Sequence, residues 1–238
     1  MPEDGVKTMQ ENILERVNEV RQHVTHLFED ANKMGDFNLR AIVYFAIIEC
    51  FAQEYFAGSG KVNAEMFCEF ILEFSKNNSS YSVLAEIDPV TAFYHHEQEA
   101  KQANFSLDYL EDGYKYEATQ IVGLTKSKDL TAYLSKNFKS DTEKHSYIKL
   151  LYKNRSKLSH NCTRPQTVPP FCHNDDTIYY MPFGNLNNFD EPTEWKLIFP
   201  NSYLQNLFTV SIENYLEYCR TSSRDPFHNS KEYRHWYE

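Results

Sequence analysis

The chain has 238 residues, of which 41% are hydrophobic and 24% charged, and it carries a net charge of -10. This length can build one substantial core or two small ones, and the composition is that of a globular protein rather than a disordered one. Only seven glycines are present, which disfavours an all-β architecture with many tight turns.

Targeting and membrane signals are absent from the sequence pattern. The longest apolar run covers residues 41–48, far short of the roughly 20 residues of a membrane-spanning helix. The acidic N-terminus lacks the apolar region of a signal peptide. Five cysteines are an odd number, which argues against a disulfide framework. We therefore expect a cytoplasmic protein with no membrane association.

The first predicted helix covers residues 8–34. Thr8 and Glu11 form a capping-box pattern, and Gly35 is a natural stop. Apolar residues then alternate at spacings of four and three: Ile13, Val17, Val20, Val24, Leu27, Ala31 and Met34. Such a narrow apolar seam suits either an internal bundle or a dimer interface.

The next predicted helices follow in order. Residues 38–56 are apolar nearly all round, which indicates a central buried helix interrupted by Glu49. Asn63 caps a third helix. Asp88-Pro89 opens a fourth, which passes through His95-His96 on what we interpret as a solvated face. A helix beginning at Ser127 comes next.

A capping box over residues 140–143 predicts a helix that runs to about Asn161 before Pro165. Beyond a proline-rich loop, two short β-branched and aromatic runs predict a β-hairpin over about 176–199, and a last helix begins at Ser202. We expect a mostly α-helical bundle with a small β-hairpin insertion before the last helix. It would form a single domain over 1–220, followed by a polar tail over 221–238.

Charge is distributed unevenly along the chain. The segment from Lys126 to Arg164 contains ten basic and three acidic residues, so it carries +7 while the remainder carries -17. A basic segment in an acidic protein can bind a polyanion. It can equally be a solvated helix face whose lysines pair with acids elsewhere in the fold.

Residues 152–161, Tyr-Lys-Asn-Arg-Ser-Lys-Leu-Ser-His-Asn, resemble the Arg-x4–6-His motif of HEPN domains (higher eukaryotes and prokaryotes nucleotide-binding). Arg21 and His26 have the same spacing, but the position of Arg155 late in a helix matches the family better. HEPN domains are helical bundles, often homodimeric. Many are metal-independent ribonucleases of toxin, defence and RNA-processing systems, and others are non-catalytic binding modules.

The resemblance implies that Arg155 and His160 are the catalytic pair, in a cleft formed where the motif helices of two protomers meet. In the catalytic hypothesis, Glu49 and Asn161 are candidate supporting residues, and Lys149, Lys153, Lys157 and Arg164 attract the RNA backbone. The other possibility is that Arg155 pairs with a buried acid such as Glu49 and that His160 merely ends the helix. The resemblance implies an endoribonuclease that cleaves tRNA or another structured RNA through 2′-hydroxyl attack. The alternative is a non-catalytic module that binds a nucleic acid or a protein such as an antitoxin.

The residue types suit this chemistry independently of the resemblance. Arginine offers a permanent cation with a planar fork for phosphate oxygens, and histidine gains or loses a proton near neutral pH. Arg155 and His160 point about 140° apart on an ideal helix. Either the last turn opens, or the two groups meet through a partner chain, which favours a homodimer.

A zinc set can be assembled from His160, Cys162, Cys172 and His173, whose side chains are suitable ligands. Their spacing matches neither of the usual paired-ligand patterns. No dinucleotide loop, nucleophile elbow or kinase signature is present. We therefore expect no cofactor and no metal.

Overall fold

The computed structural model describes residues 9–110, 115–161, 175–183 and 194–229. It is mostly helical with a small antiparallel sheet, as the sequence predicts. No helix among these residues is long and apolar enough to cross a membrane. The chain groups into two compact units, residues 1–75 with 205–238 and residues 76–204. The single domain over 1–220 stays a prediction.

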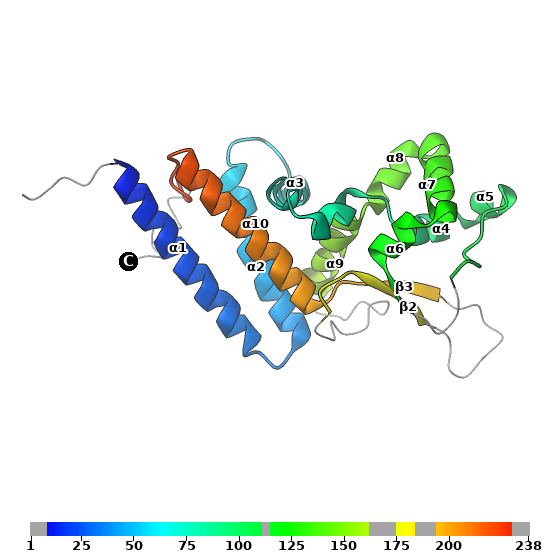
Figure 1. Ribbon diagram of the computed structural model, residues 1–238, viewed down its shortest axis with the longest axis horizontal. Coiled ribbons are helices and arrows are strands. Elements are labelled where there is room, and N and C mark those ends of the chain that lie inside the picture. The colour runs from blue at the N-terminus through cyan, green and yellow to red at the C-terminus, as the bar shows by residue number, and fades with distance from the viewer. Residues whose placement is uncertain (1–8, 111–114, 162–174, 184–193, 230–238) are drawn as a thin grey trace, which may run out of the picture. The chain divides into compact units, whose positions relative to one another are not determined.

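In its described residues, the first unit contains four helices: α1 (Met9–Asn32), α2 (Phe37–Tyr55), α3 (Asn63–Ser75) and most of α10 (Asn201–Thr221). Figure 1 shows α1, α2 and α10 as long rods that run side by side. The Asp36 side chain caps α2 by accepting the N–H groups of Asn38 and Leu39. Gly58 and Gly60 follow α2 with φ of 79° and 74°, a backbone that glycine adopts without strain.

The apolar seam of α1 is buried inside this unit. Its buried residues are Ile13, Val17, Val20, Val24, Phe28 and Ala31. The sequence pattern predicted that Leu27 belongs to the buried seam. Phe28 is buried instead, and its ring centroid lies 5.4 Å from that of Tyr44 on α2. Met34 lies beyond the helix and is exposed. The seam suited either an internal bundle or a dimer interface, and in the structure it packs within the bundle.

Aromatic rings fill the core of the first unit. The Tyr215 ring of α10 lies 5.8 Å from Phe51 and 5.5 Å from Phe70. Phe227 is 2% exposed and packs 5.2 Å from Phe51, and the Tyr215 hydroxyl donates to the Pro226 carbonyl at 2.8 Å. These contacts hold the described part of the segment after α10, up to residue 229, against the first unit, and the polar tail over 221–238 stays a prediction.

The second unit contains many short elements: η1 (Ser79–Ala85), α4 (Pro89–His95), α5 (Glu97–Gln102), β1 (Tyr116–Glu117), α6 (Ala118–Gly123), α7 (Thr125–Asn137), α8 (Lys139–Thr142), η2 (Glu143–His145), α9 (Tyr147–Asn161), β2 (Tyr179–Phe183) and β3 (Glu194–Ile198). The predicted hairpin is confirmed, since β2 pairs antiparallel with β3 and Tyr180 lies opposite Leu197. The two-residue strand β1 extends the sheet on the other side of β2.

The predicted start of the motif helix at Ser140 is wrong. A short α8 and the 3₁₀ turn η2 intervene, and α9 begins at Tyr147. The segment before α9 pairs with the segment before α4: the Asp88 N–H donates to the His145 carbonyl at 2.9 Å, and the Tyr147 N–H donates to the Glu86 carbonyl at 3.0 Å. These bonds hold Ser146 extended, with ψ of 145°, so a helix cannot pass through it.

A buried polar network anchors the first turn of α9. Asp88, the N-cap of α4, accepts hydrogen bonds from the Val90 N–H, the Thr91 hydroxyl and the Tyr180 hydroxyl. The Tyr180 hydroxyl also lies 2.5 Å from that of Tyr147. Burial raises the pKa of Asp88 and raises the pKa values of both tyrosines well above their usual range. The network fixes α4, α9 and β2 to one another.

Candidate functional site

The predicted phosphate-binding lysines lie on one side of α9. Lys149, Lys153 and Lys157 are exposed and follow one another at four-residue intervals. On a regular helix they occupy an arc of about 80° and a line about 12 Å long. Arg164 lies outside the described residues. Three of the four residues predicted to bind phosphate therefore lie on one side of α9, and we call these three lysines the lysine stripe.

The two predicted catalytic residues occupy different sides of α9. The helix continues to Asn161, so its last turn does not open, and positions 155 and 160 lie about 140° apart. Position 160 falls within the arc of the lysine stripe. Arg155 is half-buried, with its guanidinium carbon 5.7 Å from the centre of the Tyr152 ring. The side chains of His160 and Asn161 lie outside the described residues.

The predicted supporting residue Glu49 and the second Arg-x4-His match belong to the first unit. Glu49 is half-buried on α2. Arg21 of the second match donates from Nε to Glu213 of α10 at 2.8 Å, so it serves as an ion-pair partner within the helical bundle. The other predicted site residues lie in the second unit or outside the described residues.

A pocket of about 460 Å³ opens beside the lysine stripe, between α4, α9 and β3. We call it the α9 pocket. Its polar and aromatic lining comprises Thr91, Tyr94, Glu97, Lys153, Asn154, Lys157, Glu194, Trp195 and Lys196. The Tyr94 hydroxyl accepts the Trp195 backbone N–H at 2.9 Å, which joins α4 to β3 across the pocket wall.

The charges of the α9 pocket favour an anion moderately. The pocket is lined by three lysines and two glutamates. Lys196 lies 3.6 Å from Glu194, so Lys153 and Lys157 are the cations of the pocket that would attract an anion most strongly. Tyr94 is 37% exposed, so its ring can contact a ligand. A volume of this size suits a small organic molecule or one nucleotide unit.

Sequence reasoning selected Lys153 and Lys157 but missed Tyr94, Asn154, Trp195 and Lys196. The predicted hairpin contained Trp195, yet no periodic signal shows which helix a strand will pack against. The interpretation of His95-His96 as a solvated face is also wrong for His96, which is 6% exposed. Cys162, Cys172 and His173 of the considered zinc set lie outside the described residues.

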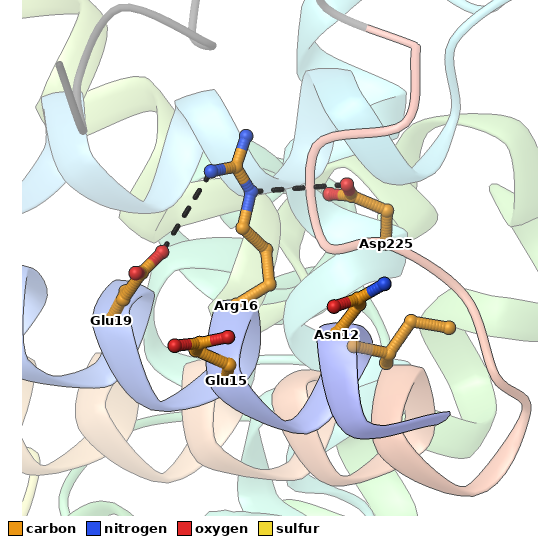
Figure 2. Close-up of a pocket in the computed structure, with 6 residues that line it drawn as sticks. Asn12, Glu15, Arg16, Glu19 and Asp225 are labelled. Carbon is orange, nitrogen blue, oxygen red and sulfur yellow. Dashed lines mark ion pairs between the residues drawn. The ribbon is translucent and has the colours of Figure 1, made fainter. Parts of the chain in front are cut away.

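A second hollow, of about 290 Å³, lies in the first unit where α1 meets Asp225. Figure 2 shows Arg16 reaching between two acids, with Glu19 3.7 Å and Asp225 3.9 Å from its guanidinium nitrogens. Glu15 adds a third carboxylate. This acidic lining disfavours phosphate, so the hollow is a poor candidate for a nucleic-acid site.

Comparison with protein-family models, curated proteins and solved structures finds no match to this chain. The HEPN resemblance therefore rests on residues 152–161.

Proposed function

We propose that this protein binds RNA along the lysine stripe of α9 and cleaves it, without a metal, through Arg155 and His160. The observation that carries the proposal is the α9 pocket, where Lys153 and Lys157 adjoin an exposed tyrosine ring and an amide side chain. Neither the stripe nor the pocket alone is distinctive. Their coincidence on the helix that bears the HEPN-like motif favours a nucleic acid over other anions.

Each part of the pocket has a role in this proposal. Lys153 and Lys157 bind backbone phosphates, mainly through charge. The Tyr94 ring offers a face on which an unpaired base can stack, and the Asn154 amide can donate to and accept from a base edge. Because bases in a duplex are stacked and covered, an unpaired loop or single strand is the expected ligand.

Besides the protein and RNA, the proposed reaction needs only solvent water. The 2′-hydroxyl attacks the adjacent phosphorus as its proton passes to water, the bond from phosphorus to the 5′-oxygen breaks, and protonated His160 donates its proton to that oxygen. A cyclic phosphate and a 5′-hydroxyl result. Position 160 lies near the C-terminal end of α9, where the helix dipole favours the protonated imidazole that this step requires. Arg155 stabilises charge on the phosphate.

The divergence of positions 155 and 160 makes a homodimer part of the mechanism. Arg155 lies away from the α9 pocket, so Arg155 of one protomer would complete the site around position 160 of its partner. A two-fold interface would form two such sites.

A second candidate is a non-catalytic module that binds RNA or a protein such as an antitoxin. The same divergence favours it, because one chain does not bring Arg155 near position 160. The half-buried guanidinium beside Tyr152 also fits a packing role. Binding of RNA without cleavage would favour this candidate, and absence of RNA affinity would favour a protein partner.

Fluorescence anisotropy with a single-stranded RNA tests the binding step. We expect Lys153→Ala and Lys157→Ala each to weaken affinity and to lower the slope of log affinity against log salt by about 0.7 to 1. Lys33→Ala removes an exposed lysine of the first unit and should change neither. Equal affinities for all four proteins would contradict RNA binding at the α9 pocket.

A further inference from the structure

Three histidines of the second unit converge in space although the sequence separates them. His95 ends α4, His96 is its C-cap and His145 ends η2. One ring nitrogen from each lies within 4.8 Å of the others. The rings of His95 and His145 are 4.9 Å apart, and those of His95 and His96 are 4.8 Å apart.

The end of α4 explains how neighbouring residues can face one point. Adjacent side chains on a continuous helix diverge by about 100°. His96 instead has φ of -118° and ψ of 34°, so the helix breaks there. Its ring stacks on Phe138 at 4.4 Å between centroids and stands at 88° to the His95 ring.

Two of these rings are buried, and among the described residues three of their four nitrogens are without a hydrogen-bond partner. His96 and His145 are each 6% exposed. Among the described residues, His96 Nε2 and both ring nitrogens of His145 have no partner. A buried polar atom that lacks a partner normally costs a protein stability. Three converging imidazoles, two of them buried with unpartnered nitrogens, therefore indicate a ligand that accepts electron pairs from nitrogen.

We infer that His95, His96 and His145 bind one divalent transition-metal ion of the zinc class. Imidazole suits zinc, nickel and copper, whereas magnesium and calcium require oxygen ligands. Ligands of a tetrahedral zinc ion with bonds near 2.05 Å lie about 3.4 Å apart, so ring nitrogens that now lie within 4.8 Å of one another must approach by up to about 1.4 Å. His95 is exposed and can make this adjustment by rotating its side chain.

The surroundings hold two of the ligand-bearing segments in place. The His145 carbonyl accepts the Asp88 N–H, and Asp88 caps the helix that carries His95. Lys153 and Asp141 act on His145 with opposite charge, and the effect of Lys153 is the larger of the two. Three histidines leave a fourth position for water or another ligand, as in zinc sites that remain open.

This inference is independent of the proposed RNA cleavage, which uses neither a metal nor these histidines. A bound ion would tie the end of α4 to η2 and so stabilise the second unit. The RNA-cleavage assay in excess chelator and the metal-binding assay can therefore fail separately.

Titration of the chelator-treated full-length protein with Zn²⁺ tests the site, with Co²⁺ as a spectroscopic probe. We expect one ion per chain and, at 100 times the dissociation constant, a rise in melting temperature of about 5 °C or more. His95→Ala should weaken Zn²⁺ affinity more than about tenfold, and His145→Gln should do the same. His95 is exposed, so its variant keeps the test valid if His145→Gln does not fold.

His26→Ala, which removes an exposed histidine of the first unit, should bind Zn²⁺ normally. A double variant Cys162→Ser/Cys172→Ser should also bind normally, because its cysteines belong to the alternative zinc set. The inference is overturned if neither ion binds near one per chain at micromolar concentration. It is equally overturned if His95→Ala leaves the affinity unchanged, or if loss of the two cysteines alone abolishes binding.

Discussion

Asp88 shows how one residue organises the region around α9. It caps α4, its main chain bonds His145, and its carboxyl accepts the Tyr180 hydroxyl at 2.5 Å. The side chain is fully buried, and burial raises its pKa despite these donors. A buried carboxylate without a cationic partner costs stability when it ionises.

We expect this cost to appear as a pH dependence of stability that Asp88→Asn removes. Because the folded pKa exceeds the ordinary value of about 3.9, the native state holds the proton more tightly. The stabilisation by protonated Asp88 is complete below pH about 4 and is lost as pH rises through the folded pKa. Asparagine keeps the cap and needs only the Thr91 hydroxyl to reverse its role.

Urea denaturation of the wild type and Asp88→Asn at a series of pH values measures this effect. The other titrating groups are common to both proteins. The free energy of unfolding of the wild type, minus that of the variant, should fall as pH rises from about 4 and then level off. A difference that stays constant or rises with pH would show that Asp88 is not held protonated by burial.

Helix and strand periodicity predicted most of the elements. The cap at Asp88 and the β2–β3 hairpin were predicted from the sequence, because a few adjacent residues determine each of them. The start of α9 was predicted wrongly, since residues 140–143 have a good local capping pattern, whereas Ser146 pairs with Ile87 and interrupts the helix. Tertiary hydrogen bonds override local propensity here.

The contrast between Ser140 and Asp36 gives an element-scale prediction. Asp36→Ala removes a side chain that caps α2 and should cost about 1 kcal/mol of unfolding free energy. Ser140 lies inside α8 and starts no long helix. Ser140→Ala should therefore stay within about 0.5 kcal/mol of wild type in urea denaturation. If Ser140→Ala lowered the free energy of unfolding as much as Asp36→Ala, that result would support a continuous helix beginning at residue 140 and contradict the structure.

The candidate sites were predictable only in part. Lys149, Lys153 and Lys157 share a face of one helix, and helix geometry alone places them together. Tyr94 and Trp195 are joined by a hydrogen bond although 101 residues separate them in the sequence. His96 and His145 come together because helix α4 ends at His95. Neither contact leaves a periodic pattern in the sequence, so only the tertiary structure shows them.

At the scale of the whole molecule, the α1 seam no longer supports a dimer, because its apolar residues are buried within the first unit. Any two-fold interface must use another surface. The homodimer now depends on the divergence of Arg155 and position 160 and on the HEPN resemblance. Two lysine stripes brought together would repel each other, so assembly should depend on salt or on a bound polyanion.

Light scattering at micromolar concentration tests this assembly. We expect twice the 28.1 kDa mass of one chain. At low ionic strength the dimer should need added RNA, and at higher ionic strength, where salt screens the repulsion, it should form without RNA. Val20→Ala should lower the free energy of unfolding by about 2 kcal/mol without changing that mass, because Val20 packs within one chain. A strict monomer, with RNA and without, would contradict the dimer and the composite site.

The proposed chemistry is tested most directly by RNA cleavage in excess chelator with mixed variants. We expect wild type to cut RNA, Arg155→Ala and His160→Ala each to be inactive, and their equimolar mixture to recover roughly a quarter of the activity. When protomers exchange freely, half of the dimers contain one protomer of each variant. In such a dimer one of the two composite sites has both Arg155 and His160, so a quarter of all sites are intact. Identical, uncut RNA after incubation with wild type and with His160→Ala would contradict the account.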